Sequence, residues 1–150
     1  MTTPANSQLV QLLTRQVECY RDLLKLSDVQ SELVRQGRDD ELLEVLARRQ
    51  GVMDRVSDID ARLSTAKADW PAAVARLDEE ARASVEALVG TSRQLLEQIT
   101  AADASDAMLL QQRRMNVGRE LRQASQGKQL NRSYAAAAYA RPDTRLDLQQ

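Results

Sequence analysis

The sequence predicts an all-α protein: an elongated antiparallel helical bundle or coiled coil in which a helical hairpin is followed by a long third helix. Strong helix formers such as Leu, Ala, Arg, Glu and Gln dominate the 150 residues. Only five Gly and three Pro are present, which leaves few turn signals for β-hairpins. The apolar residues recur at intervals of three and four, which is the spacing of one face of a helix.

The first helix is predicted over about 7–36. Pro4, Asn6 and Ser7 are helix-start residues that precede the apolar pattern. Its main apolar row consists of Val10, Leu13, Val17, Tyr20, Leu24, Ser27, Ser31 and Val34. A second row, mostly of leucines, lies beside it, so the apolar face is wide enough for two neighbouring helices. We interpret Cys19, the only cysteine of the chain, as a small core residue of this second row.

A short turn separates this helix from a second one, which is predicted over about 40–64. Gly37 can adopt the left-handed conformation that ends a helix, and Asp39 or Asp40 can cap the next one. Because the turn is short, the second helix is expected to pack antiparallel to the first. Its apolar row consists of Val45, Arg49, Val52, Val56, Ile59 and Leu63. For the charged member, Arg49, we expect a buried aliphatic stem and a solvated head.

The third helix is predicted over about 72–126. Pro71 disfavours a helical conformation at Trp70 and is itself acceptable in a first helical turn. We expect Trp70 to close one end of the core in preference to binding a ligand. The polar residues at 100–106 allow a bend in this helix. Gly118, inside the same helix, indicates either close packing or a local kink.

The length of this third helix predicts an exposed apolar strip. At about 1.5 Å per residue it is roughly 75 Å long, which is about twice the length of either helix of the hairpin. The hairpin therefore cannot cover its whole apolar face, and the stretch 108–124 is expected to stay exposed. Such a strip is typical of a partner site. The residues expected to bind the partner are Met108, Leu109, Met115, Val117 and Leu121.

Charge is distributed unevenly along the chain, although the net charge is only −1. Residues 1–112 have 13 basic and 19 acidic side chains, whereas residues 113–150 have 8 basic and 3 acidic ones. The basic end either compensates the acidic body within the molecule or docks on an acidic partner surface. We predict one helical domain over 1–135, followed by a flexible basic tail over 136–150.

The residues that enzymes use most are missing or scattered. The chain has no His, which is the commonest metal ligand and the commonest acid–base catalyst. We therefore predict no catalytic residue, no metal site, no cofactor and no enzyme activity. Nucleic-acid binding is disfavoured because the pI is about 5.6. No signal peptide and no apolar run of membrane-spanning length is visible, so a cytoplasmic location without membrane insertion is expected.

Two stretches of the sequence resemble a known family. The turn and second helix read "GRDDELLEVLARRQGVMDRVSDIDARL", and the third helix ends in "LLQQRRMNVGRELRQASQGKQLNRSYAA". Together they resemble the FlgN-type flagellar type III export chaperones and, more loosely, the FliT-type chaperones. The turn motif of the family is matched by Gly37, Asp39, Leu42, Leu46, Arg48, Arg49 and Met53. The resemblance extends over about 8–135, and "ITAADASDAMLL" departs from it because the usual Asn-centred polar segment is missing.

The resemblance implies a chaperone that holds a helical terminal segment of hook–filament junction proteins and delivers them to the flagellar export gate and its ATPase complex. A FliT-type member would instead hold the filament cap protein. The family uses a tyrosine near the C-terminus to contact the gate. Tyr134 is the first candidate and Tyr139 the second, with Lys128 and Arg132 supplying charge. Alternatively, Tyr134 packs against Leu130 and completes the last helical turn.

Two functions from other classes remain open for the same exposed strip. It can join two copies of the chain, which would make the protein a self-associating structural coiled coil and a homodimer. It can also mask a helix of a transcription factor, which would make the protein a regulator.

Overall fold

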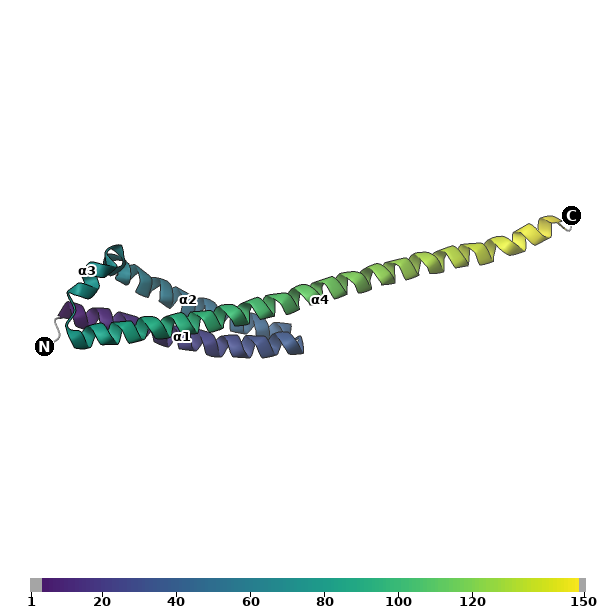
Figure 1. Ribbon diagram of the computed structural model, residues 1–150. Coiled ribbons are helices and arrows are strands. Elements are labelled where there is room, and N and C mark those ends of the chain that lie inside the picture. The colour runs from purple at the N-terminus through teal and green to yellow at the C-terminus, as the bar shows by residue number, and fades with distance from the viewer. Residues whose placement is uncertain (1–3, 149–150) are drawn as a thin grey trace. The chain divides into compact units, whose positions relative to one another are not determined.

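A computed structural model describes the backbone of residues 4–148 and the side chains of residues 8–138. Within that range the chain forms four helices and no strand (Figure 1). They are α1 (Pro4–Gln36), α2 (Asp39–Ala68), α3 (Trp70–Ala75) and α4 (Glu79–Leu148). The predicted all-α fold with a helical hairpin and a long final helix is therefore confirmed.

The chain divides into two compact units, residues 1–109 and residues 110–150. The first unit contains α1, α2, α3 and the beginning of α4, whereas the second unit contains only the rest of α4. The sequence predicted a single domain that reaches residue 135. The structure differs because no residue between 107 and 138 is buried, so the packed core ends well before that point.

The turn between α1 and α2 forms as the sequence predicted. Gly37 has a φ of 67°, and its left-handed backbone places the N–H of Arg38 3.0 Å from the carbonyl oxygen of Leu33. Asp39 and Asp40 were expected to cap α2, but they lie inside its first turn. In that position their carboxylates interact favourably with the positive end of the helix dipole.

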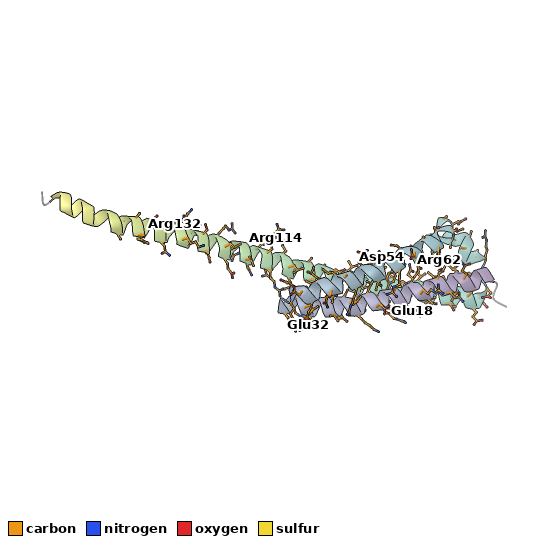
Figure 2. The ribbon with its side chains drawn as sticks, turned by 180° about the vertical axis from the view of Figure 1, so that it is seen from behind. Glu18, Glu32, Asp54, Arg62, Arg114 and Arg132 are labelled. Atoms are coloured by element: carbon orange, nitrogen blue, oxygen red, sulfur yellow. The ribbon has the colours of Figure 1, made fainter. Side chains whose placement is uncertain are left out.

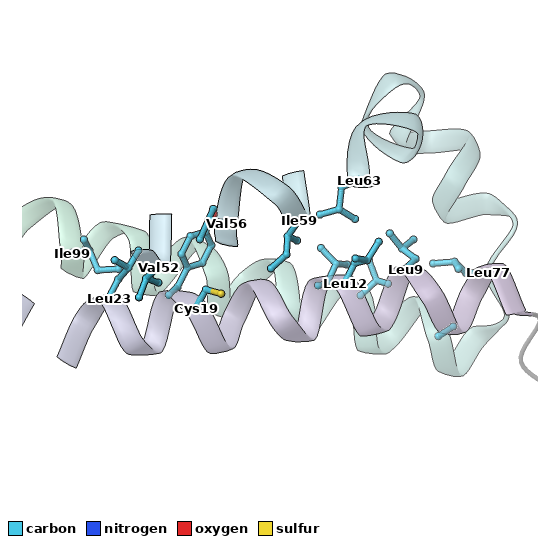
Figure 3. Close-up of a cluster of buried hydrophobic side chains, with 14 residues drawn as sticks. Leu9, Leu12, Cys19, Leu23, Val52, Val56, Ile59, Leu63, Leu77 and Ile99 are labelled. Atoms are coloured by element: carbon cyan, nitrogen blue, oxygen red, sulfur yellow. The ribbon is translucent and has the colours of Figure 1, made fainter. Parts of the chain in front are cut away.

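The core of the first unit is built from the predicted apolar rows. The buried cluster combines Leu9, Leu12, Leu13, Cys19, Tyr20 and Leu23 of α1 with Val52, Val56, Ile59 and Leu63 of α2 (Figure 3). Leu77, between α3 and α4, and Ala81, Val85 and Ile99 of α4 complete it. The beginning of α4 therefore packs against the hairpin, as the third member of a three-helix core.

The corner between α2 and α4 is more elaborate than predicted. Instead of one helix from residue 72, a short helix α3 is followed by a break and then by α4. Asp69 caps α3 by accepting the N–H of Ala72 at 3.3 Å, and Asp78 caps α4 by accepting the N–H of Ala81 at 2.8 Å. Trp70 packs against the core cluster, which confirms its predicted place.

A polar network joins three helices near the end of the first unit. Arg49 of α2 donates two hydrogen bonds to Asp103 of α4, at 2.6 and 2.8 Å, and a third to Gln30 of α1 at 2.6 Å. Gln30 in turn donates to the buried Asp106 at 2.9 Å. The prediction of a solvated Arg49 head was therefore wrong, because the side chain is only 16% exposed and its guanidinium is paired with Asp103.

The same network explains the polar stretch at 100–106. This stretch stays helical, and its two aspartates face partners on α1 and α2. The hydrogen bonds to Asp103 raise the pKa of Arg49 above its ordinary value, and burial opposes them. The polar residues thus fix the register of the three helices, since shifting α4 would leave buried polar groups without partners.

The helix α4 extends beyond the predicted end near residue 126. It passes Gly127 and includes residues 136–148, which were expected to form a flexible tail. A single glycine costs about 1 kcal/mol inside a helix, which lowers helix stability without ending the helix. The four consecutive alanines at 135–138 have the highest helix propensity of all residues and favour continuation.

Stability at alkaline pH tests the burial of Cys19. Burial raises the pKa of its thiol, Arg55 opposes that shift, and Asp22 and Glu18 add to it. Below the unfolded pKa of about 8.5 the thiol is protonated in both states and adds no pH dependence. As the pH rises past that value, the unfolded state loses the proton first, so folding stability falls. We expect a Cys19→Ala variant to lose less stability between about pH 8 and pH 10, measured by urea unfolding. Equal losses in the two proteins would contradict this assignment.

Candidate functional site

The residues 110–138, which we call the C-terminal segment, are a helix without any buried side chain. Its large apolar side chains nevertheless include Leu110, Met115, Val117, Leu121, Leu130 and Tyr134, all of which are exposed. Val117 is 53% exposed and Leu121 is 66% exposed. When a partner covers apolar area of this kind, the free energy falls by about 25 cal/mol for each Å² that is buried.

The predicted partner-binding residues do not form a single strip. Met108, 75% exposed, and Leu109 belong to the first unit, and the other three belong to the C-terminal segment. Within the segment, Val117 and Leu121 are four residues apart and share a face. Met115 and Val117 are two residues apart, which is about 200° around a helix, so they lie on opposite faces.

The apolar face of the segment is therefore narrower than predicted. It consists of Leu110, Val117 and Leu121, at intervals of seven and four residues, and Ala124 follows in the same register. All of these side chains are exposed. A narrow seam of this type contacts one helix at a time.

A shallow hollow of about 270 Å³ lies beside this seam. It is lined by Gln111, Arg114, Met115, Gly118, Arg119 and Arg122. The Nε of Arg122 donates to the carbonyl oxygen of Gly118 at 3.3 Å, which holds the stem of that arginine across the hollow. The sequence interpretation named Gly118 but missed the hollow. The spacing of three arginines around a glycine is the signal that would have found it.

The hollow concentrates positive charge in a segment that is already basic. The C-terminal segment contains six basic side chains, at 113, 114, 119, 122, 128 and 132, and one acidic side chain, Glu120. Figure 2 shows Arg114 and Arg132 on the outside of the helix. Arg119 and Arg122 are three residues apart, where like charges destabilise a helix by a few tenths of a kcal/mol. The surface is therefore suited to a partner that carries negative charge.

The residues predicted to contact an export gate are also exposed where the structure describes them. The side chain of Tyr134 is 66% exposed, and Lys128 and Arg132 are exposed as well. Leu130 is exposed too, so Tyr134 is not buried against it. Arg132 and Tyr134 are two residues apart and face opposite sides of the helix. The side chain of Tyr139 lies outside the described residues.

The first unit has an open groove of about 820 Å³ that the sequence interpretation also missed. Leu13 and Tyr20 of α1, Trp70 of α3, and Val89 and Leu96 of α4 are among the residues that line it. Its charged lining residues are Lys67, Arg93 and Glu97, and most of the others are apolar. The sequence signal for it is weak, because the groove depends on how three helices splay apart.

Other kinds of site are not formed by the described residues. Among residues 8–138, no group of three His, Cys, Asp or Glu side chains is arranged to hold a metal ion. In the part of the chain that the structure describes, no helix combines the length and the apolar composition that a bilayer crossing requires.

The chain matches no known protein family at a significant level, and no curated protein sequence and no solved structure is significantly similar to it.

Proposed function

We propose that this protein is a helix-binding chaperone of flagellar type III export, which holds the helical terminal segment of a hook–filament junction protein on its C-terminal segment. The observation that carries the proposal is the exposure of Leu110, Val117 and Leu121 on one face of α4. A seam of this spacing contacts an amphipathic helix, whose apolar residues recur at the same intervals. Binding of this kind requires no covalent chemistry.

The strength expected for such a contact suits a chaperone. Each large apolar side chain contributes roughly 1.5–3 kcal/mol when it is covered. Association and side-chain ordering oppose this gain, so a few anchors support binding in the micromolar to nanomolar range. A client is then protected from aggregation and is still released on delivery.

The resemblance to the FlgN-type chaperones supplies the identity of the client and of the destination. It rests on the turn motif around Gly37 and on the basic stretch that leads into Tyr134. On this proposal, Tyr134 contacts the export gate, and Lys128 and Arg132 attract the gate electrostatically. The exposure of Tyr134 supports that role, since aromatic side chains contribute strongly at interfaces.

Self-association is a second candidate function, because the spacing of the seam is also that of a coiled coil. In a homodimer the seams of two copies would cover each other. The six basic side chains against one acidic side chain oppose this arrangement, since two such segments repel each other. The oligomeric state in solution separates the two candidates.

Replacing both Val117 and Leu121 with glutamine is expected to weaken binding of a purified hook–filament junction protein by about 100-fold or more. The change removes two apolar anchors, and a loss of about 2.7 kcal/mol corresponds to that factor. Glutamine is a strong helix former, so the helix itself is retained. Isothermal titration calorimetry measures the affinity, and circular dichroism confirms the helix content.

The matched control is the double change of Leu43 and Leu46 to glutamine. Both side chains are exposed on α2, so the control adds the same polar groups to the other unit. We expect it to bind the client as the original protein does. Unchanged binding in the Val117 and Leu121 variant would refute the proposal. A stable dimer that this variant dissociates, without any client binding, would establish self-association instead.

A further inference from the structure

The hollow over Gly118 has the geometry of a socket for a side chain of another helix. Among the residues that line it, Gln111, Arg114, Met115 and Gly118 occupy positions i, i+3, i+4 and i+7 of α4. In helix packing, four residues with this spacing form the hole that receives one side chain of the facing helix. The glycine leaves one corner of this hole open, because it has no Cβ.

Nothing among the described residues accounts for the glycine. A Cβ built on Gly118 would meet no atom within 4 Å, so no neighbouring part of the described chain requires its absence. Glycine also weakens the helix that contains it. Gly51, Gly90 and Gly127 have equally open surroundings, and what distinguishes Gly118 is the hollow that three arginines line around it. A second helix that approaches closely there would use the space that the missing Cβ leaves.

The rim of the socket determines the chemistry of that second helix. Met115 is the large apolar side chain among the residues that line the hollow, and the seam with Val117 and Leu121 lies beside it. Arg114, Arg119 and Arg122 also line the hollow. Guanidinium groups bind carboxylates through pairs of hydrogen bonds, and the pairing is stronger where water is excluded. The complementary surface is an apolar side chain with carboxylates beside it.

We propose that the socket binds an acidic amphipathic helix of a partner protein, with one apolar side chain inserted above Gly118 and a neighbouring Asp or Glu held by the arginines. This proposal deepens the proposed function and rests on it, since it specifies the chemistry of the client helix. The client helix should therefore carry acidic residues next to its apolar seam.

The observations favour a protein helix over nucleic acid as the occupant. Phosphates would also be attracted to the arginines, but a phosphate backbone would not cover the apolar side chain of Met115 in the hollow or the apolar seam beside it. Tyr134 is the only aromatic side chain described in the C-terminal segment, so bases would have little to stack on. The first unit is acidic, with 13 basic and 19 acidic residues, and it repels a polyanion.

The test uses two synthetic peptides of about 20 residues with the same apolar heptad pattern. One peptide carries Glu at the positions beside the seam, and the other carries Lys there. Fluorescence anisotropy measures the binding of each to the full chain, and a single-stranded oligothymidine serves as a polyanion probe. We expect the Glu peptide to bind at least about tenfold more tightly than the Lys peptide.

The decisive variant is Gly118→Leu, which fills the socket and keeps every charge. It is expected to weaken binding of the Glu peptide by at least about tenfold, although leucine strengthens the helix. The matched control is Gly127→Leu, because Gly127 is an exposed glycine of the same helix and lies outside the hollow. The control should bind as the original chain does.

A second pair of variants tests the arginines. Changing Arg119 and Arg122 together to glutamine should reduce binding of the Glu peptide by at least about tenfold, and changing Lys128 and Arg132 together should reduce it less. Equal effects of the two double changes, or of the two glycine changes, would overturn the socket. Tight binding of the oligothymidine that is lost in the Gly118→Leu variant would overturn it as well.

The failure of this inference is distinguishable from the failure of the proposed function. If the junction protein binds through Val117 and Leu121 but the Gly118→Leu variant binds it equally well, the socket is refuted and the chaperone proposal stands. If the Glu peptide requires Gly118 but the junction protein does not bind, the socket stands and the flagellar client is refuted.

Discussion

Replacing Leu23 with alanine is expected to lower the free energy of unfolding of the first unit by about 2–5 kcal/mol. The side chain is only 2% exposed and lies in the cluster where α1, α2 and α4 meet (Figure 3). Truncation loses the free energy of burial and leaves a cavity that the surrounding helices cannot fill completely. Urea unfolding followed by the fluorescence of Trp70, the single tryptophan, reports on this unit specifically.

The matched control is Leu43→Ala on α2. Leu43 is 66% exposed, so the same chemical change removes little buried area. Its effect is expected to stay within about 0.5 kcal/mol. If the two leucine variants unfolded at the same urea concentration, the assignment of the core would be wrong.

Replacing Arg49 with methionine is expected to destabilise the first unit by about 2–4 kcal/mol. Methionine keeps most of the aliphatic stem and removes the guanidinium, which is hydrogen-bonded to Asp103 and Gln30. The two acceptors then lose their donor in a partly buried place. The same Trp70 fluorescence assay measures the effect.

Two further variants separate the network from the loss of a charge. Arg48→Met removes the neighbouring exposed arginine and should change stability by no more than about 0.5 kcal/mol. Replacing Asp103 with leucine in the Arg49→Met background should restore part of the stability, because the unpaired carboxylate is gone. If Asp103→Leu lowered the stability of the Arg49→Met variant by as much as it lowers the stability of the original protein, Arg49 and Asp103 would not be coupled.

The helices of the hairpin could be predicted because their burial follows from spacing alone. Every apolar member of the predicted row of α2, from Val45 to Leu63, is buried. The turn at Gly37 was equally readable, since a glycine followed by acidic residues fits one backbone geometry. In these places local preference and tertiary packing favour the same structure.

The polar network could not be predicted from the sequence because its members are far apart. Arg49 and Asp103 are separated by 54 positions, and Gln30 and Asp106 by 76. A charged residue in an apolar row has two physical outcomes, a solvated head or a buried partner. Periodicity does not decide between them, because the partner is brought close only when the third helix packs.

The exposure of the C-terminal apolar side chains could be predicted, but their arrangement around the helix could not. Exposure of Met115, Val117 and Leu121 follows from the length of the final helix, whereas their division between opposite faces follows from its pitch. The prediction treated them as one strip because it counted apolar residues over a window. The hollow at Gly118 was missed because a glycine contributes no side chain to such a pattern.

Because α4 is continuous, the entropy cost of ordering the C-terminal segment on binding depends on how far along the helix the ligand binds. Starting a helix is entropically unfavourable, and the packed turns around Val85 and Ile99 already meet that requirement. The C-terminal segment needs only propagation, which adds one hydrogen bond for each residue that is fixed. Backbone order should thus decline gradually from residue 110 toward Tyr134. A ligand bound near Gly118 then immobilises fewer new torsions than one bound further along, so equal contacts yield tighter association there.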